Sequence, residues 1–506
     1  MKRSLTKHEQ TRTADFVLCG AGRAAELPAA ALRRRSRARF TDVPASHWAS
    51  SQITRAVDLG LFQGETSTRF GLGHPMTRAA FAVVLCRFFD WEMVTPDQGS
   101  YTDNQDPNAW DYSAVETAYA HGAITSQTSD FRPADSIARE ELAVMLLRAM
   151  GYGTIAGLAH DLPMPFRDVR TNSGYLSMAY ALGLISGTSA TTFSPDQAAT
   201  REQAAVILMR LYDKLHAADP GRVGIIASAG DDADFSGFDA VAVDAGRLSH
   251  PGHIQLSHAM KEADAAALTG SIQEAGAKAL FYVTGSASAL KGDAAETAAI
   301  LKEAVEDGGY DGLFLDLPRL GDASKSDLTA LVRALREALG ERLLYVMAEA
   351  PAWQGTSYGG YDYAALGASA DRLVLRVAAY QKESDGFPIA PLDPPEEVYY
   401  ALGELKDTVS ADRLSLLVTT TATAWDSEGD RTGTLSGEEL QELLEKRGTT
   451  RYYSTRYACA YLTSDAEDAR VVWFLDETSL AERTQLAKLF GVSQLCLSDM
   501  TSLPTA

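Results

Sequence analysis

The chain has 506 residues, of which 46% are hydrophobic and 22% are charged, as in globular proteins with more than one domain. Its formal net charge of −21 argues against a nucleic-acid partner, because binding to phosphates needs concentrated Lys and Arg. No apolar run approaches the roughly 18–20 residues that span a bilayer, so no transmembrane segment is expected.

Residues 1–39 are strongly basic, with ten Lys or Arg against Glu9, Asp15 and Glu26, a net charge of +7 (10 − 3). A secretory signal contains an apolar core of roughly 7–15 residues. The apolar run from Pro28 to Leu32 is too short for such a core, and no signal peptide is recognised. Either export uses no visible signal, or this segment is not the natural N-terminus; the preferred explanation is a displaced start or a shifted reading frame.

One sequence unit is present in three copies between residues 40 and 217. Each copy opens with an aromatic-x-Asp motif, continues into a helical pattern that stops at a glycine, and begins a second helix at an arginine. The motifs begin at Phe40, Tyr101 and Phe166, the glycines are Gly60, Gly122 and Gly183, the loops between the helices contain Phe70, Phe131 and Phe193, and the arginines are Arg78, Arg139 and Arg201. A single unit cannot bury its apolar face, so we expect three units around a shared core.

In this order the elements resemble the S-layer homology module. The resemblance implies an all-α, pseudo-threefold prism with repeats at 40–98, 99–160 and 161–217. It also implies that the grooves between repeats bind secondary cell-wall polysaccharide, often with a pyruvylated sugar. A guanidinium can pair bidentately with a ketal carboxylate while an aromatic ring stacks on the sugar. The residues carried over as ligand-facing or groove-shaping are Arg78, Arg139, Arg201, Asp42, Trp48 and Trp110.

Each repeat departs from the pattern of the module. Repeat 1 has Ala79-Ala80 in place of Ala-Glu, repeat 2 has Ser126 where a glycine is expected, and repeat 3 lacks the His-Trp pair. One or two grooves are therefore expected to be silent, with repeat 3 mainly architectural. The competing interpretation is that each arginine only neutralises a neighbouring carboxylate.

After a short linker at 218–221, apolar strands alternate with helical stretches as far as the C-terminus. Eight such strands over 222–506 predict an α/β fold, a (β/α)8 TIM barrel. The predicted strands are Val223–Ala227, Ala240–Val243, Ala279–Val283, Gly312–Asp316, Leu343–Ala348, Leu373–Val377, Leu414–Val418 and Gln494–Leu497. Chemistry on this fold lies at the C-terminal ends of the strands.

The segment from Tyr310 to Pro318 resembles the fourth strand of glycoside hydrolase family 18, whose signature is DGxDxDxE. Further matches in order resemble the spore-cortex and germination branch of that family. There, an Asp orients the substrate acetamido group and a Glu two residues later protonates the leaving oxygen. Asp311 and Asp316 remain in this chain, but the middle Asp is Phe314 and the Glu is Pro318. Loss of acid–base assistance alone costs roughly 10²–10⁴ in rate.

Two further departures affect the same site. The Met-x-Tyr-Asp motif of the sixth strand reads Arg376-Val377-Ala378-Ala379, and the Trp of the eighth strand falls near Ser498. Acids near predicted strand ends that could substitute are Asp244, Glu349, Asp426 and Asp476. Trp353, Trp425 and Trp473 are candidates for stacking on a glycan, although packing within the core explains them equally well.

Metal and cofactor sites have little support. No GxGxxG, P-loop, HExxH or GxSxG context occurs, and the nine His are scattered. Cys19, Cys86, Cys459 and Cys496 form no CxxC pair and are expected to be free thiols, mostly buried. Neither a metal nor a cofactor is therefore expected.

Three functional hypotheses follow. The first is an exported, wall-anchored bacterial surface protein whose barrel is a pseudoenzyme that binds peptidoglycan or another N-acetylated glycan, or acts as a scaffold. The second is an active N-acetylglucosaminidase with a displaced general acid. The third is a purely structural S-layer component.

Overall fold

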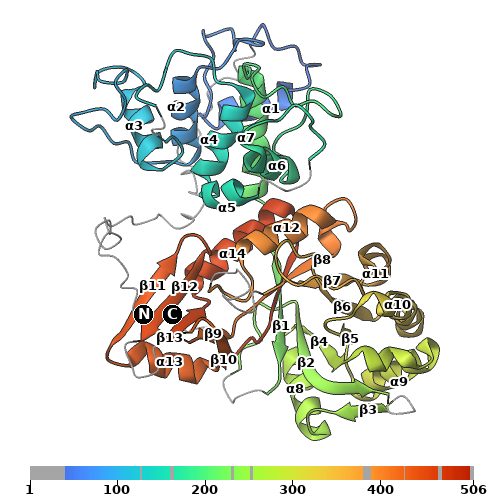
Figure 1. Cartoon of the computed structure of the whole chain (residues 1–506). Coiled ribbons are helices and arrows are strands. Elements are labelled where there is room, and N and C mark those ends of the chain that lie inside the picture. Colours follow the sequence, from blue (N-terminus) through green and yellow to red (C-terminus); the bar gives the residue numbers. More distant parts are fainter. Residues whose placement is uncertain are drawn as a thin grey trace.

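The computed structural model describes residues 40–125, 128–159, 164–228, 233–250, 255–379, 389–426, 428–464 and 470–501. The basic segment 1–39, which includes Cys19, and Ser126 lie outside the described residues. Figure 1 shows a helical domain followed by a barrel that carries a small additional sheet. Within the described ranges, no helix has the length and apolarity needed to cross a membrane. Cys86, Cys459 and Cys496 are buried and free, as predicted.

Three pairs of helices build the helical domain. They are α1 (Ser50–Asp58) with α2 (Arg78–Phe88), α3 (Tyr112–Ala120) with α4 (Arg139–Ala149), and α6 (Ser173–Ala181) with α7 (Arg201–Leu215); a short α5 (Gly153–Leu158) is added after α4. The first helix of each pair ends at a glycine with positive φ: Gly60 (76°), Gly122 (70°) and Gly183 (68°). Glycine adopts this left-handed conformation without steric cost, which explains the repeated stop.

The three repeats close into a ring through short backbone bridges before their second helices. Thr77 pairs with Ser136, Ala138 pairs with Ala198, and Thr200 pairs with Pro75. Each bridge joins one repeat to another, so the order is 1 to 2, 2 to 3 and 3 to 1. The apolar faces of the helices therefore share one core, as the repetition predicted.

Eight parallel strands form a closed barrel, and every predicted strand is confirmed. The strands are β1 (Gly221–Ile226), β2 (Ala240–Ser249), β4 (Lys278–Gly285), β5 (Gly312–Asp316), β6 (Leu343–Glu349), β7 (Arg372–Arg376), β8 (Leu414–Val418) and β14 (Gln494–Leu497). β1 pairs with both β2 and β14, which closes the ring, and β3 (Gln255–His258) adds to β2 in antiparallel sense. The surrounding helices are α8 (Glu262–Glu274), η2 (Ala287–Lys291), α9 (Ala294–Asp307), η3 (Asp322–Ser324), α10 (Lys325–Leu339), α11 (Tyr363–Ser369), α12 (Pro395–Leu405), η5 (Ala411–Arg413) and α14 (Glu477–Phe490).

A separate antiparallel sheet is inserted between β8 and α14. Its strands are β9 (Ala422–Trp425), β10 (Arg431–Leu435), β11 (Thr449–Ser454), β12 (Cys459–Ser464) and β13 (Arg470–Phe474), in the order β10-β9-β13-β12-β11, and α13 (Gly437–Glu445) lies between β10 and β11 in the chain. This stretch was expected to belong to the barrel, and a separate sheet was not predicted.

The helical domain contacts the barrel directly (Figure 1). Lys214 of α7 donates to the Leu489 carbonyl of α14 at 2.6 Å, and Lys488 pairs with Asp219 at 2.9 Å. The Lys406 ammonium lies 4.0 Å from the centre of the Tyr180 ring. The two domains are therefore packed against each other and are not joined by the linker alone.

Candidate functional site

The three repeat arginines each reach into a different repeat. Their Nε atoms donate to the backbone carbonyl of a loop phenylalanine and their guanidinium groups lie over its ring. Arg78 binds the Phe131 carbonyl at 2.7 Å, Arg139 binds that of Phe193 at 3.0 Å, and Arg201 binds that of Phe70 at 2.9 Å. In each case the guanidinium carbon lies 4.5–5.0 Å from the centre of the same phenylalanine ring. These contacts combine a hydrogen bond with a cation–π interaction and hold the ring of repeats together.

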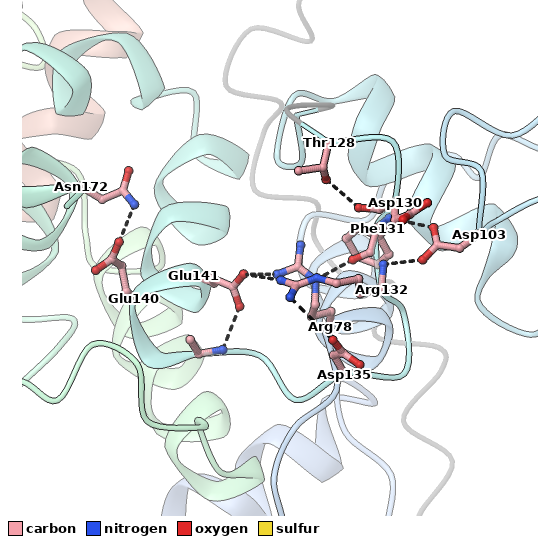
Figure 2. Close-up of polar contacts among 11 residues, drawn as sticks. Arg78, Asp103, Thr128, Asp130, Phe131, Arg132, Asp135, Glu140, Glu141 and Asn172 are labelled. Atoms are coloured by element: carbon pink, nitrogen blue, oxygen red, sulfur yellow. Dashed lines mark hydrogen bonds and ion pairs between the residues drawn. The ribbon is translucent and has the colours of Figure 1, made fainter.

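The outer guanidinium nitrogens differ among the three arginines. Arg139 Nη2 donates to the Ser186 carbonyl at 2.9 Å, and Arg201 Nη2 donates to the equivalent Gln63 carbonyl at 2.6 Å. Arg78 instead forms an ion pair with Glu141, as Figure 2 shows. Among the residues that the structure describes, neither Arg139 nor Arg201 has an ion-pair partner. Neutralisation of a neighbouring carboxylate therefore applies to Arg78 alone.

Burial lowers the pKa of both Arg139 and Arg201 below the ordinary arginine value. Burial disfavours the charged form of a base, and nearby carboxylates only partly offset this effect. An anion in contact with these guanidinium groups would therefore be strongly favoured.

Two exposed tryptophans accompany these arginines. Trp48 is 60% exposed and Trp110 is 70% exposed, although large apolar rings usually avoid water. Trp48 of repeat 1 lines a pocket with Arg139 of repeat 2 and with Ser186 and Gln203 of repeat 3. The threefold repetition predicts that Trp110 of repeat 2 accompanies Arg201 of repeat 3 in the same way.

Repeat 3 supplies no tryptophan to the remaining groove, which contains Arg78. At the start of the first helix of repeat 3, the Asn172 side chain donates to Glu140 at 2.5 Å (Figure 2). This groove therefore lacks the aromatic ring of the other two.

Asp42 has a structural position at the base of the repeat 1 loop. Its carboxylate accepts hydrogen bonds from the amides of Phe70, Gly71 and Leu72 at 2.8, 2.8 and 3.1 Å. Burial by itself would raise the pKa of Asp42, but these hydrogen bonds outweigh it and lower the pKa below the ordinary value of 3.8. Asp103 and Asp168 bind the equivalent loops in repeats 2 and 3.

Replacing Asp42 with Asn is expected to lower the Tm of the chain by a few degrees at pH 7. A carboxylate with a depressed pKa stabilises the fold above pH 3.8 and loses that contribution as the pH falls through the depressed value. The Tm difference should therefore shrink below pH 3.8 in melts followed by circular dichroism. Asp58→Asn, at an exposed carboxylate, is the control and should leave the Tm unchanged. Equal melting of Asp42→Asn and the wild type at pH 7 would contradict the structural role.

At the C-terminal end of the barrel, one arginine joins two carboxylates. Arg376, the last residue of β7, donates to both oxygens of Asp316 at 3.1 and 2.5 Å and to Glu349 at 3.1 Å. Asp316 ends β5 and Glu349 ends β6, and they are only 3% and 6% exposed. Tyr282 of β4 also donates to Asp316 at 2.5 Å. Asp316 and Glu349, at the C-terminal end of the barrel, therefore already accept hydrogen bonds from side chains of the same chain.

Charge and burial act in opposite directions within this network. Burial alone would lower the pKa of the Arg376 guanidinium, but the charge and hydrogen bonds of Asp316, with Glu349 adding to them, hold it well above the ordinary value. Burial and the nearby Asp316 charge raise the pKa of Tyr282.

The residues at the missing catalytic positions have other contacts. Phe314 is fully buried and packs edge-to-face with Tyr282 and Tyr345, with ring centres 5.2 and 5.8 Å apart. Pro318 is half-buried and has no titratable group. The amide of the next residue, Arg319, donates to Glu349 at 3.2 Å, which places this carboxylate beside the position of the missing Glu.

Most of the other predicted acids lie elsewhere. Asp311 precedes β5, at the opposite end of the strand, and binds Lys278 and the Ala279 amide. Asp426 binds the backbone of its own loop, and Asp476 caps α14. Asp244 pairs with Arg247 and lies on β2 opposite Tyr282 of β4, so it is beside the network. Of the four acids considered as replacements for the missing Glu, Glu349 is the one that pairs with Arg376, which also binds Asp316.

Trp425 and Trp473, two of the three candidates for stacking on a glycan, do not lie at the ends of barrel strands. Both belong to the inserted sheet, in β9 and β13, and both are buried in a cluster with Ala390, Tyr457 and Cys459. Trp425 Nε1 donates to the Ala390 carbonyl at 3.1 Å. Trp353 is half-buried in the segment after β6, where its amide donates to Glu397 at 2.7 Å, and it stays a candidate.

Arg376 was predicted only as a departure from the Met-x-Tyr-Asp motif, and its ion pairs with Asp316 and Glu349 were not predicted. The sequence did contain a signal for these ion pairs. It has a basic residue at the end of one predicted strand and acids at the ends of two neighbouring strands. Tyr282 and Gln203 were also missed, since neither belongs to the motifs used.

Family models match both parts of the chain. The S-layer homology domain matches residues 39–82, 105–143 and 165–205, and the model for glycosyl hydrolases family 18 matches residues 274–492. An endoglucanase from a Bacillus species is 29% identical over 190 residues, which are 36% of this chain and 19% of the relative. An S-layer protein from Bacillus licheniformis is 28% identical over 181 residues, 35% of this chain and 20% of the relative. The matched segment thus spans only about a fifth of these relatives.

Among solved structures, a chitinase from Chromobacterium violaceum is 18% identical, with a TM-score of 0.48 over 56% of this chain and 95% of its own. The repeats and the S-layer relative indicate a cell-surface protein associated with the cell wall. The chain therefore combines an S-layer homology triple repeat with a glycosyl hydrolase family 18 domain.

Proposed function

We propose that this chain anchors itself to the cell wall through its repeats and displays a barrel without hydrolytic activity. The repeats bind a secondary cell-wall polysaccharide that carries carboxylate groups, such as a pyruvylated sugar. The barrel binds an N-acetylated glycan such as peptidoglycan or serves as a surface scaffold.

The observation that carries the proposal for the barrel is the contact of Arg376 with both Asp316 and Glu349. A general acid must bring a proton to the leaving oxygen, and both carboxylates near the position of the missing Glu are already engaged by the Arg376 guanidinium. Asp316 is also fixed by two donors and is not free to orient an acetamido group. Pro318 supplies no proton in place of the missing Glu.

The anchoring role is supported by the arginines and tryptophans of the repeats. Arg139 and Arg201 are cations without an ion-pair partner in the described part of the chain, and exposed tryptophans lie beside the grooves. A carboxylated sugar complements both features, because it offers an anion to the guanidinium and a ring face to the indole.

The position of Glu349 favours a second candidate function, a hydrolase that uses a displaced acid. Glu349 Oε1 lies 3.2 Å from the Arg319 amide, close to where the family's Glu would stand. In that case Glu349→Gln would abolish cleavage. The ion pair with Arg376 argues against this candidate.

The test uses the purified full chain with peptidoglycan, chitin oligomers and wall sacculi. We expect no release of reducing ends, and co-sedimentation with sacculi that falls when the secondary polymer is stripped. Cleavage that Asp316→Asn abolishes would contradict the non-hydrolytic barrel. Undiminished binding to stripped sacculi would contradict the anchor. Binding of oligomers without cleavage would favour the glycan-binding role of the barrel, and no binding would favour the scaffold.

A further inference from the structure

The loop after β6 carries Trp353, the one tryptophan candidate that follows directly on the end of a barrel strand. The loop begins beside the Arg376 network, because Glu349 ends β6 and the Ala350 amide donates to the Arg376 carbonyl at 2.8 Å. Trp353 is four residues from Glu349 in the chain. It therefore lies at the C-terminal end of the barrel, where this fold binds its ligands.

A buried carboxylate from another helix holds the backbone of this loop. Glu397, in the first turn of α12, accepts the amide of Trp353 through Oε2 at 2.7 Å. Its Oε1 accepts the next two amides, those of Gln354 and Gly355, at 2.8 and 3.1 Å. Three consecutive N–H groups on one carboxylate fix the path of the backbone. Glu397 is 0% exposed, so it acts on the loop and cannot touch a ligand.

A second contact fixes the loop against the neighbouring strand end. Gly355 lies so close to Ala378 that a β-carbon at position 355 would come within 2.4 Å of the Ala378 methyl group. Ala378 stands where the Met-x-Tyr-Asp motif of the family has its Tyr, so a small residue replaces a large one beside this loop. The backbone that carries Trp353 is thus held between α12 and the segment after β7.

The indole of Trp353 has no partner within the described part of the chain. Its N–H donates to no described residue, solvent reaches it, and no described aromatic ring stacks on it. Trp425, in contrast, is fully buried and donates to the Ala390 carbonyl. A half-buried indole with a free N–H offers an apolar face to a sugar ring and a donor to an acetamido oxygen.

We propose that the glycan of the barrel stacks on Trp353 and that Glu397 is the positioning residue that holds this tryptophan in place. The ligand is an N-acetylated saccharide, whose ring packs on the indole and whose acetamido oxygen accepts the indole N–H. Glu397 contributes through the three amides of the loop, because it is closed to the ligand. This inference rests on the proposed binding of an N-acetylated glycan by the barrel.

The test is titration calorimetry of the full chain with the tetramer of N-acetylglucosamine. The neutral glucose tetramer of cellulose, which lacks acetamido groups, is the ligand control. Trp353→Ala is expected to weaken binding of the acetylated tetramer by about tenfold or more. Trp353→Phe keeps a stacking face without the N–H, so it should bind more tightly than Trp353→Ala but lose preference for the acetylated tetramer.

A double variant separates positioning from a merely structural role of Glu397. Glu397→Gln should weaken binding severalfold and lower the Tm, since its amide group cannot accept all three N–H donors. In the Trp353→Ala background, Glu397→Gln should lower the Tm again without a further loss of affinity. Glu404→Gln, at an exposed carboxylate of the same helix, is the matched control and should change neither quantity.

Two results would overturn the inference: undiminished binding by Trp353→Ala, or additive losses of affinity in the double variant. The first is independent of how well the Glu397 variants fold. If the wild type bound no acetylated tetramer, the proposed glycan binding by the barrel would itself fail.

Discussion

Replacement of Arg376 with Met is expected to lower the free energy of unfolding of the barrel by about 3 kcal/mol or more. The substitution leaves Asp316 and Glu349 as buried carboxylates without a counter-ion. Removal of one partner from a buried ion pair is costly because the remaining charge stays out of water. Denaturant unfolding followed by fluorescence measures the loss.

A charge-matched variant separates this cause from lost packing. Addition of Asp316→Asn and Glu349→Gln to Arg376→Met removes the unpaired charges and should recover most of the stability. If Arg376→Met were as stable as the wild type, the network would not stabilise the barrel.

Replacement of Phe314 with Asp is expected to destabilise the barrel by more than the about 3–5 kcal/mol typical of a buried Phe→Ala change. The substitution reinstates the Asp of the family signature, but the side chain at 314 is fully buried between Tyr282 and Tyr345. An unpaired carboxylate there would add its desolvation cost to the cost of the cavity. Thermal and denaturant unfolding measure the effect.

Phe314→Leu is the matched control, because it keeps an apolar side chain and should cost less than about 2 kcal/mol. A Phe314→Asp chain with the stability of the wild type would show that the interior tolerates the acid. The expected result means that the catalytic motif cannot be rebuilt one residue at a time.

Local patterns were sufficient to predict the barrel strands and the helix pairs of the repeats. The eight barrel strands are short apolar runs of ordinary length, and each was predicted at its observed position within a few residues. The glycines that end the first helices follow from local conformational preference. The repeated arginines follow from the similarity of sequence between the three units.

The inserted sheet could not be predicted in the same way. The connections between its paired strands differ in length. Trp425 on β9 and Trp473 on β13 are brought together although four other elements separate these strands in the chain. Burial of both rings depends on which face of the sheet meets the segment around Ala390. A tryptophan in the core of a sheet and one at a binding surface have the same sequence signal.

The sequence by itself determined the threefold repeat, the barrel and the absence of a titratable group at Pro318, because these depend on periodicity and residue type. Only the tertiary structure decided the partners of the charged groups. Arg376 meets Asp316 across 60 residues and Glu349 across 27, and Arg201 meets the carbonyl of Phe70 across 131. Such pairs follow from strand register and ring closure, so identical arginines in three repeats acquired different partners and different chemistry.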